Sequence, residues 1–167
     1  VDNATDYRTN LIGHIQTPES FTKAQHQAFY NAYQAVLSYE SGRTQEQYNT
    51  AVSAIESLKT ATVSESETIT SWNERLAIVL TAVSLEKAEV SLVKQDFLNT
   101  KDLFDKLTLN SNKDLITERL SDLAQYHTTS DLLIKMEDLV GNNEAFFAYV
   151  NPTTIKEIRE NIALTNK

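Results

Sequence analysis

The sequence predicts an all-α protein: an elongated pair of tandem three-helix bundles that share one long central helix, followed by a C-terminal helical extension. Three observations lead to this prediction. The 167 residues include only three glycines and two prolines, so little interrupts regular structure. Apolar residues recur at spacings of three and four, which is the period of a packed helix. A helical unit is repeated at an offset of 49 residues.

The repeat consists of matching residues in two stretches of the chain. Tyr48 and its neighbours correspond to Phe97 and its neighbours at an offset of 49 residues. A Glu-Arg-Leu sequence at 74–76 returns at 118–120, an offset of 44, because the connection before the first copy is five residues longer. Arrays of helical units usually span, display or bind, so the repeat predicts a protein that is not an enzyme.

The first predicted elements are a leading helix and a helical hairpin. Residues 6–15 are expected to form the short leading helix. Ser20 is the predicted N-cap of a longer helix, although Lys23 stands where a capping box requires Glu or Gln, and Gly42 is its predicted left-handed C-cap. Thr44 is the predicted N-cap of the next helix. The very short turn between these two helices predicts that they are antiparallel neighbours.

The longest predicted helix, residues 67–90, is expected to be shared by two bundles. Its main apolar stripe keeps a strict three-four rhythm, and Trp72 on that stripe is predicted to lie in the core: Ile69, Trp72, Leu76, Val79 and Val83. Its opposite side is also apolar, as a helix between two bundles requires. We therefore expect a first bundle at 1–90, a second bundle at 67–127 that shares the long helix, and a C-terminal cap or link at 128–167.

The C-terminal elements do not follow the repeat. Beyond Thr128, Ser130 is predicted to begin a separate helix that runs to Val140. Asn151 and Pro152 have the residue types of an N-cap and a first helical position, so they predict a terminal helix. An atypical last unit is what an array needs to cover its exposed end.

The composition excludes several classes of protein. The net charge of −8, from 23 acidic and 15 basic residues, argues against nucleic-acid binding, which needs Lys and Arg on one face. No apolar run approaches the roughly 20 residues of a membrane-spanning helix, so no membrane insertion is expected. The lack of cysteine excludes thiol nucleophiles and disulfides. Because the chain begins at Val1 without Met or a signal peptide, we expect neighbouring domains in a longer polypeptide.

No motif for catalysis or metal binding is present in the sequence. The three histidines, His14, His26 and His127, are scattered, and no two lie four residues apart on a helix. No pair among the 23 carboxylates is distinguished for acid–base chemistry, and Glu118 with Arg119 is interpreted as an exposed surface pair. The sequence therefore predicts no catalytic residue, no metal and no cofactor.

Two tyrosines are the candidate ligand-binding residues. Tyr30 and Tyr33 lie at the margin of an alanine stripe on the helix that follows Ser20. An aromatic face that carries a hydroxyl can stack on a sugar ring or anchor a partner protein. The simpler interpretation is that both tyrosines pack against the leading helix.

The repeated unit resembles helical modules found in surface proteins of Gram-positive bacteria. The resemblance covers about residues 21–127 and is carried by residues 88–91, 94–97, 107 and 115–120, with 40–48, 55 and 58 matching its first part. The unit is similar to the FIVAR-type modules and to the helical cell-wall-binding domain of S-layer proteins. This resemblance implies an extracellular three-helix bundle in a cell-envelope protein that binds carbohydrate or wall polymer.

We therefore expect a non-enzymatic helical module of a bacterial surface or secreted protein, located outside the cell or in the wall. It would serve in adhesion, in association with cell wall or carbohydrate, or as a rigid spacer, with a wall polymer, a glycan or a host or partner protein as its partner. The alternative is an intracellular or phage-borne adaptor that binds a partner protein through a groove between helices.

Overall fold

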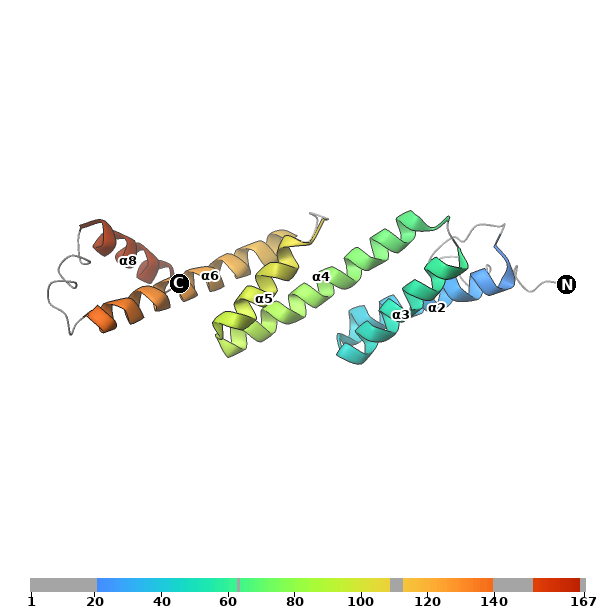
Figure 1. Cartoon of the computed structure of the whole chain (residues 1–167), viewed down its shortest axis with the longest axis horizontal. Coiled ribbons are helices and arrows are strands. Elements are labelled where there is room, and N and C mark those ends of the chain that lie inside the picture. Colours follow the sequence, from blue (N-terminus) through green and yellow to red (C-terminus); the bar gives the residue numbers. More distant parts are fainter. Residues whose placement is uncertain (1–20, 63, 109–112, 140–151, 166–167) are drawn as a thin grey trace. The chain divides into compact units, whose positions relative to one another are not determined.

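Every regular element in the described part of the chain is an α-helix, which confirms the predicted all-α class. The computed structural model describes residues 21–62, 64–108, 113–139 and 152–165, so the predicted leading helix lies outside it. The helices are labelled in Figure 1: α2 (Lys23–Gly42), α3 (Gln45–Ala61), α4 (Ser66–Ser91), α5 (Lys94–Asp105), α6 (Lys113–Leu139) and α8 (Pro152–Thr165). None of these helices is long and apolar enough to cross a membrane.

The chain divides into two compact units, and the division falls inside α4. The first unit is Val1–Val83 and the second is Ser84–Lys167. The helix predicted at 67–90 is observed as α4, which runs unbroken from Ser66 to Ser91 and contributes residues to both units.

The start of α2 differs from the prediction because Thr22, rather than Ser20, is its N-cap. The Thr22 side-chain oxygen accepts a hydrogen bond from the backbone N–H of Gln25 at 3.3 Å, and the Gln25 side-chain oxygen accepts one from the backbone N–H of Thr22 at 2.9 Å. The capping box is therefore complete two residues later than expected. Gln25 also donates to the carbonyl oxygen of Ala61 at 3.0 Å, which ties the start of α2 to the end of α3.

The turn between α2 and α3 is built by Arg43 and Thr44. Arg43 has the left-handed conformation, with a φ of 59°, so the predicted left-handed C-cap at Gly42 is wrong by one residue. Gly42 leaves room for the side chain of Gln47, because a Cβ there would lie 2.1 Å from the Gln47 side-chain oxygen and that flexible side chain would have to shift. The predicted N-cap at Thr44 is confirmed, and Thr44 forms a capping box with Gln47.

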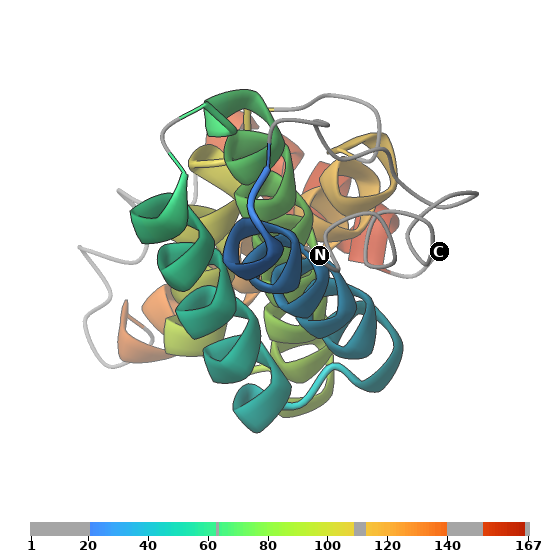
Figure 2. The same ribbon diagram turned by 90° about the vertical axis from the view of Figure 1, so that its right-hand side faces the viewer.

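The core of the first unit lies where α2, α3 and the first part of α4 meet, and Figures 1 and 2 show α2 and α3 side by side. Trp72 is 3% exposed, which confirms its predicted core position. The centre of its ring lies 5.0 Å from that of the Phe29 ring. The two rings meet edge to face, which is an arrangement that aromatic pairs prefer. The buried core residues are Phe21, Phe29, Ala32, Ala35, Val36, Tyr39, Ala51, Ile55, Leu58, Ile69, Trp72 and Leu76.

The second unit contains the end of α4 with α5, α6 and α8. The predicted helix start at Ser130 is wrong, because α6 continues through it to Leu139. The hydroxyls of Thr128 and Thr129 donate to carbonyl oxygens four residues earlier, so these polar side chains are satisfied within the helix. The terminal helix begins at Pro152 as predicted, and α8 packs on α6 (Figure 1). The buried apolar residues of the second unit are Leu85, Ala88, Phe97, Leu107, Ile116, Leu120 and Leu123.

Candidate functional site

The same two-point ion pair occurs in both units. In the first unit, Nε and Nη2 of Arg75 donate to the two carboxylate oxygens of Glu40 at 2.7 and 2.6 Å. In the second unit, Arg119 binds Glu89 in the same way, at 2.8 and 2.5 Å. The glutamates are related by the offset of 49 residues and the arginines by the offset of 44. Each pair joins the end of the unit's first helix to its third helix.

The partners of these pairs were not predicted from the sequence. The Glu-Arg-Leu motif was interpreted as an exposed pair between Glu118 and Arg119, but the guanidinium of Arg119 reaches Glu89 on another helix. Hydrogen bonds from each arginine to its carboxylate raise the pKa of Arg75 and of Arg119 above the ordinary value. Planar, two-point geometry of this kind is specific to arginine, so the pair fixes how two helices meet.

The turn that follows the glutamate has the same backbone shape in both units, but its side chains differ between them. Arg43 and Leu92, three residues after each glutamate, both lie in the left-handed region, with φ of 59° and 54°. Each N–H donates to the carbonyl oxygen four residues earlier, at 2.8 Å for Arg43 and 2.9 Å for Leu92. The next residue is the N-cap of the following helix in both units. Thr44 forms a capping box there, whereas Val93 provides no side-chain cap.

A different set of polar contacts holds the second turn together. Ser91 accepts from the backbone N–H of Val93 at 3.2 Å and donates to Asp96 at 2.8 Å. Lys87 donates to the other carboxylate oxygen of Asp96 at 2.7 Å. The hydrogen bonds from Lys87 and Ser91 hold the pKa of Asp96 below its ordinary value. The turn is therefore ordered through Asp96 rather than through an N-cap side chain.

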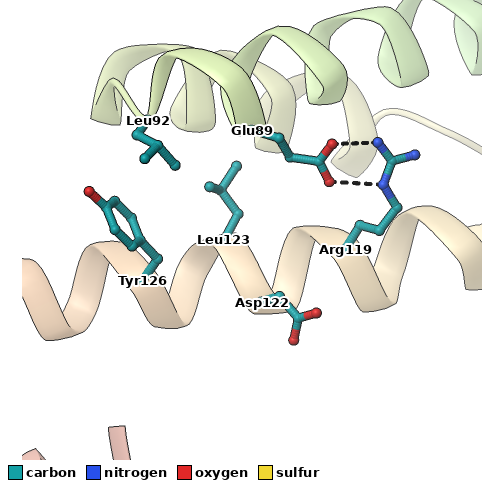
Figure 3. Close-up of a pocket in the computed structure, with 6 residues that line it drawn as sticks. All are labelled: Glu89, Leu92, Arg119, Asp122, Leu123 and Tyr126. Atoms are coloured by element: carbon teal, nitrogen blue, oxygen red, sulfur yellow. Dashed lines mark hydrogen bonds and ion pairs between the residues drawn. The ribbon is translucent and has the colours of Figure 1, made fainter. Parts of the chain in front are cut away.

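The end of α4 and the middle of α6 line an open pocket of about 230 Å³ in the second unit. Figure 3 shows Leu92, Leu123 and Tyr126 directed toward one another, with the ion pair of Glu89 and Arg119 beside them. Leu92 and Tyr126 are 44% and 37% exposed, so both present apolar surface at the opening. We call this pocket the α4–α6 groove; its lining is Glu89, Leu92, Arg119, Asp122, Leu123 and Tyr126.

The first unit has different residues at two positions that give the groove its large apolar walls. Arg43 stands in the place of Leu92, and Ala82 in the place of Tyr126, by the two repeat offsets. The first exchange replaces an apolar side chain by a charged one, and the second replaces an aromatic ring by a methyl group. The ion pair is common to both units, but these two walls belong to the second unit alone. A comparison of the two repeats in the sequence could have singled out Leu92 and Tyr126.

Tyr30 and Tyr33, the tyrosines predicted to bind a ligand, lie in the first unit on α2. Both are half-buried and pack against its core. The ring of Tyr33 lies 6.1 Å from that of Trp72. The structure therefore places the two tyrosines together at the margin of the core, with part of each ring available to solvent.

His127 on α6 is the buried polar residue whose surroundings are least usual. It is 6% exposed, and its ring packs 5.1 Å from Phe97 and 5.2 Å from Tyr126. Its Nε2 is buried and has no hydrogen-bond partner among the described residues. In the described part of the chain, no group of three or more His, Asp or Glu side chains is placed to hold a metal ion.

Comparison with models of known protein families, with curated proteins and with solved structures found no match to this chain. The functional argument therefore depends on the geometry of the two units.

Proposed function

We propose that this chain is a non-enzymatic tandem helical module of a bacterial surface or secreted protein, in which it acts as a spacer and adhesion unit. The observation that carries the proposal is the repeated ion pair. Both units join their first and third helices with the same glutamate–arginine geometry. Arrays of repeated helical units are typical of proteins that space or display binding sites.

The continuity of α4 supports the spacer role. α4 has 26 residues, and it is the third helix of one unit and the first helix of the next. A helix of this length spans about 39 Å at 1.5 Å per residue. A connection made of helix bends far less than a flexible linker, so it suits a part that holds two units apart.

The spacer role is tested by distances between spin labels, which the lack of native cysteine makes straightforward. Labels at Ser53→Cys and Ser121→Cys, both exposed, report on the two units. We expect a distance distribution as narrow as that of a control pair within the first unit, Ser53→Cys with Ser71→Cys. A distribution several times broader than the control would contradict the spacer role.

The carbohydrate part of the proposal is tested at the tyrosine pair. Tyr30→Ala and Tyr33→Ala would each be screened against glycans and cell-wall fragments beside the unchanged chain. If the two rings stack on sugar, each variant should lose most of the binding, because one stacked aromatic ring contributes about 1 kcal/mol. Tyr48→Ala, at a half-buried tyrosine of α3 outside the pair, is the matched control. Binding that survives both α2 substitutions removes these tyrosines as the site.

A second candidate function is favoured by the α4–α6 groove. An adaptor that binds a partner protein between two helices needs an apolar pocket with a polar rim, and the second unit has one. This candidate and the spacer role are compatible, because a spacer can carry a binding site on one of its units.

A further inference from the structure

The exposed surface of the α4–α5 turn is apolar in the second unit, whereas the corresponding turn of the first unit is polar. Both turns have the same length and the same left-handed residue. Yet Val90, Leu92 and Val93 are 87%, 44% and 50% exposed, which is unusual for three large apolar side chains in four positions. Their counterparts in the first unit are Ser41, Arg43 and Thr44.

This change weakens the turn locally. A leucine in the left-handed region is unfavourable by about 1 kcal/mol, and a valine N-cap forgoes a side-chain hydrogen bond of about 1 kcal/mol. The first unit shows that the same turn can be built with Thr44 as a cap. A turn of this backbone shape is therefore compatible with polar residues at both positions. Where a sequence departs from local rules without a structural gain, a functional surface is the usual reason.

The size and walls of the α4–α6 groove limit what can occupy it. Its volume of about 230 Å³ is below the roughly 300–1,000 Å³ of sites for small-molecule ligands. The walls are the apolar faces of Leu92, Leu123 and Tyr126 (Figure 3). A pocket of this kind suits one large apolar side chain that anchors a protein partner.

The charge around the groove favours a basic partner. Glu89 already binds Arg119 at both carboxylate oxygens, and Glu86 also acts on Arg119 electrostatically. Asp122 adds a further carboxylate and directs it away from the ion pair (Figure 3). Among the residues that line the groove, Asp122 is therefore a carboxylate in excess of the pair of Glu89 and Arg119, in a chain whose net charge is −8. Charge of this sign attracts Lys and Arg and discourages association with a second copy.

We propose that the α4–α6 groove binds a protein partner through an apolar side chain that enters between Leu92 and Tyr126. A neighbouring Lys or Arg of the partner lies against the carboxylate of Asp122. This inference rests on the second candidate function, partner binding through an inter-helix groove. It is independent of the spacer role, since label distances and peptide binding are separate measurements.

The test is selection of a random 12-residue peptide library on the full chain, after depletion on the Leu92→Asn chain. Asparagine tolerates the left-handed conformation, so the Leu92→Asn chain keeps the shape of the turn. Because asparagine is uncharged, depletion removes peptides that bind elsewhere and does not select for or against charged peptides. We expect the enriched peptides to share an aliphatic or aromatic residue beside Lys or Arg. Circular dichroism would confirm that each variant is folded.

Binding of one synthetic enriched peptide would then be measured by fluorescence anisotropy against matched variants. Leu92→Arg with Val93→Thr converts the turn to the residues of the first unit and should weaken binding at least ten-fold. Tyr126→Ala should do the same, and Asp122→Asn should weaken binding about three-fold, because it removes charge and little shape. Leu115→Arg makes the same change at a residue that is 76% exposed and outside the groove, so it should bind normally.

Several results would overturn the proposal. The first is a selection in which no peptide is enriched over the depleted library. The second is a set of enriched peptides that is acidic or lacks an apolar residue. The third is an enriched peptide that binds the Leu92→Arg/Val93→Thr chain as tightly as the unchanged chain. Sedimentation equilibrium gives an independent check. A dimer of the unchanged chain that Leu92→Arg abolishes would identify a second copy as the occupant and would also overturn the proposal.

Discussion

Ser84 and Thr100 illustrate how single residues differ between the two units. Their hydroxyls lie 2.7 Å apart, and Thr100 is fully buried. The corresponding residues of the first unit are Ala35 and Ala51, which are also buried. The hydroxyl of Thr100 is close to the backbone carbonyl of Asp96 as well, at 2.9 Å, so the polar pair is satisfied in its buried setting. The second unit thus tolerates polar groups at positions that are apolar in the first.

At the same scale, His127 is expected to reduce stability. Its buried Nε2 lacks a partner among the described residues, and an unsatisfied buried polar atom costs roughly 1–3 kcal/mol. We expect His127→Leu to raise the free energy of unfolding by about 1 kcal/mol in urea denaturation at pH 7. The control is His26→Leu, because His26 is also buried but, among the described residues, neither of its ring nitrogens is a buried atom without a hydrogen-bond partner. A His127→Leu chain that is less stable than the unchanged chain would contradict this expectation.

Asp96 should make the second unit sensitive to acid. Hydrogen bonds from Lys87 and Ser91 lower the pKa of Asp96 below its ordinary value of 3.8. A carboxylate whose pKa is lower in the folded state stabilises the fold above its unfolded pKa. That contribution is lost as pH falls through the folded pKa, so the loss should begin below about pH 4.

The NMR titration of the Asp96 side-chain carboxyl carbon checks this directly. Lys87→Met removes the main hydrogen-bond donor, so it should raise the pKa of Asp96 toward the ordinary value. Lys101→Met breaks an exposed pair with Asp105 elsewhere on α5 and should leave Asp96 unchanged. An unchanged Asp96 titration in Lys87→Met would contradict the assigned cause.

At the scale of elements, periodicity predicted where the helices lie better than it predicted how they begin and end. The helix at 67–90 is observed within one residue at each end, because its apolar stripes fit two cores. The N-cap at Ser20 and the helix start at Ser130 were wrong, because a serine is only one of several residues that can cap. Thr22 has Gln25 at the third helical position, and that reciprocal bond decided the start of α2. Nothing in the sequence required a break at Ser130.

Exchanging threonine and valine at the N-caps of α3 and α5 should change the free energy of unfolding in opposite directions. Thr44→Val removes a capping box and should lower the free energy of unfolding by about 1 kcal/mol. Val93→Thr supplies an oxygen that the free N–H groups at the start of α5 can use, and it should raise that energy by up to about 1 kcal/mol. Thermal and urea unfolding would measure both. If Val93→Thr lowered stability, the apolar turn would have a packing role, which would weaken the case for a binding surface.

At the scale of the whole molecule, the candidate site was harder to predict than the fold. The repeat identified the positions of Glu40, Arg75, Glu89 and Arg119, yet it did not show that they pair. The partners are 35 residues apart in the first unit and 30 in the second, so only tertiary structure brings them together. The groove was missed because isolated leucines and tyrosines at helical spacing are usually core residues.

The cooperativity of the two units can be measured because Trp72, the only tryptophan, lies in the first unit. Burial predicts blue-shifted emission that shifts to the red when that unit unfolds. We expect fluorescence and far-ultraviolet circular dichroism to give coincident urea transitions, because α4 contributes to both units. Ser84→Pro should separate the transitions by breaking α4, whereas Ser84→Ala should not. Separate transitions in the unchanged chain would show that α4 does not couple the units.

α6 has the length of a shared helix, but it lacks the glutamate that α4 uses in the repeated ion pair. α6 has 27 residues, one more than α4, so it is long enough to be shared by a further unit. An offset of 44 residues relates α4 to α6, so Leu133 of α6 corresponds to Glu89 of α4. A further unit would need a glutamate at this position to form the same ion pair with its third helix. Leu133 cannot bind an arginine, and α8 packs on α6 instead. The contact between α6 and α8 therefore cannot use, at this position, the glutamate–arginine pair that joins the first and third helices of both units.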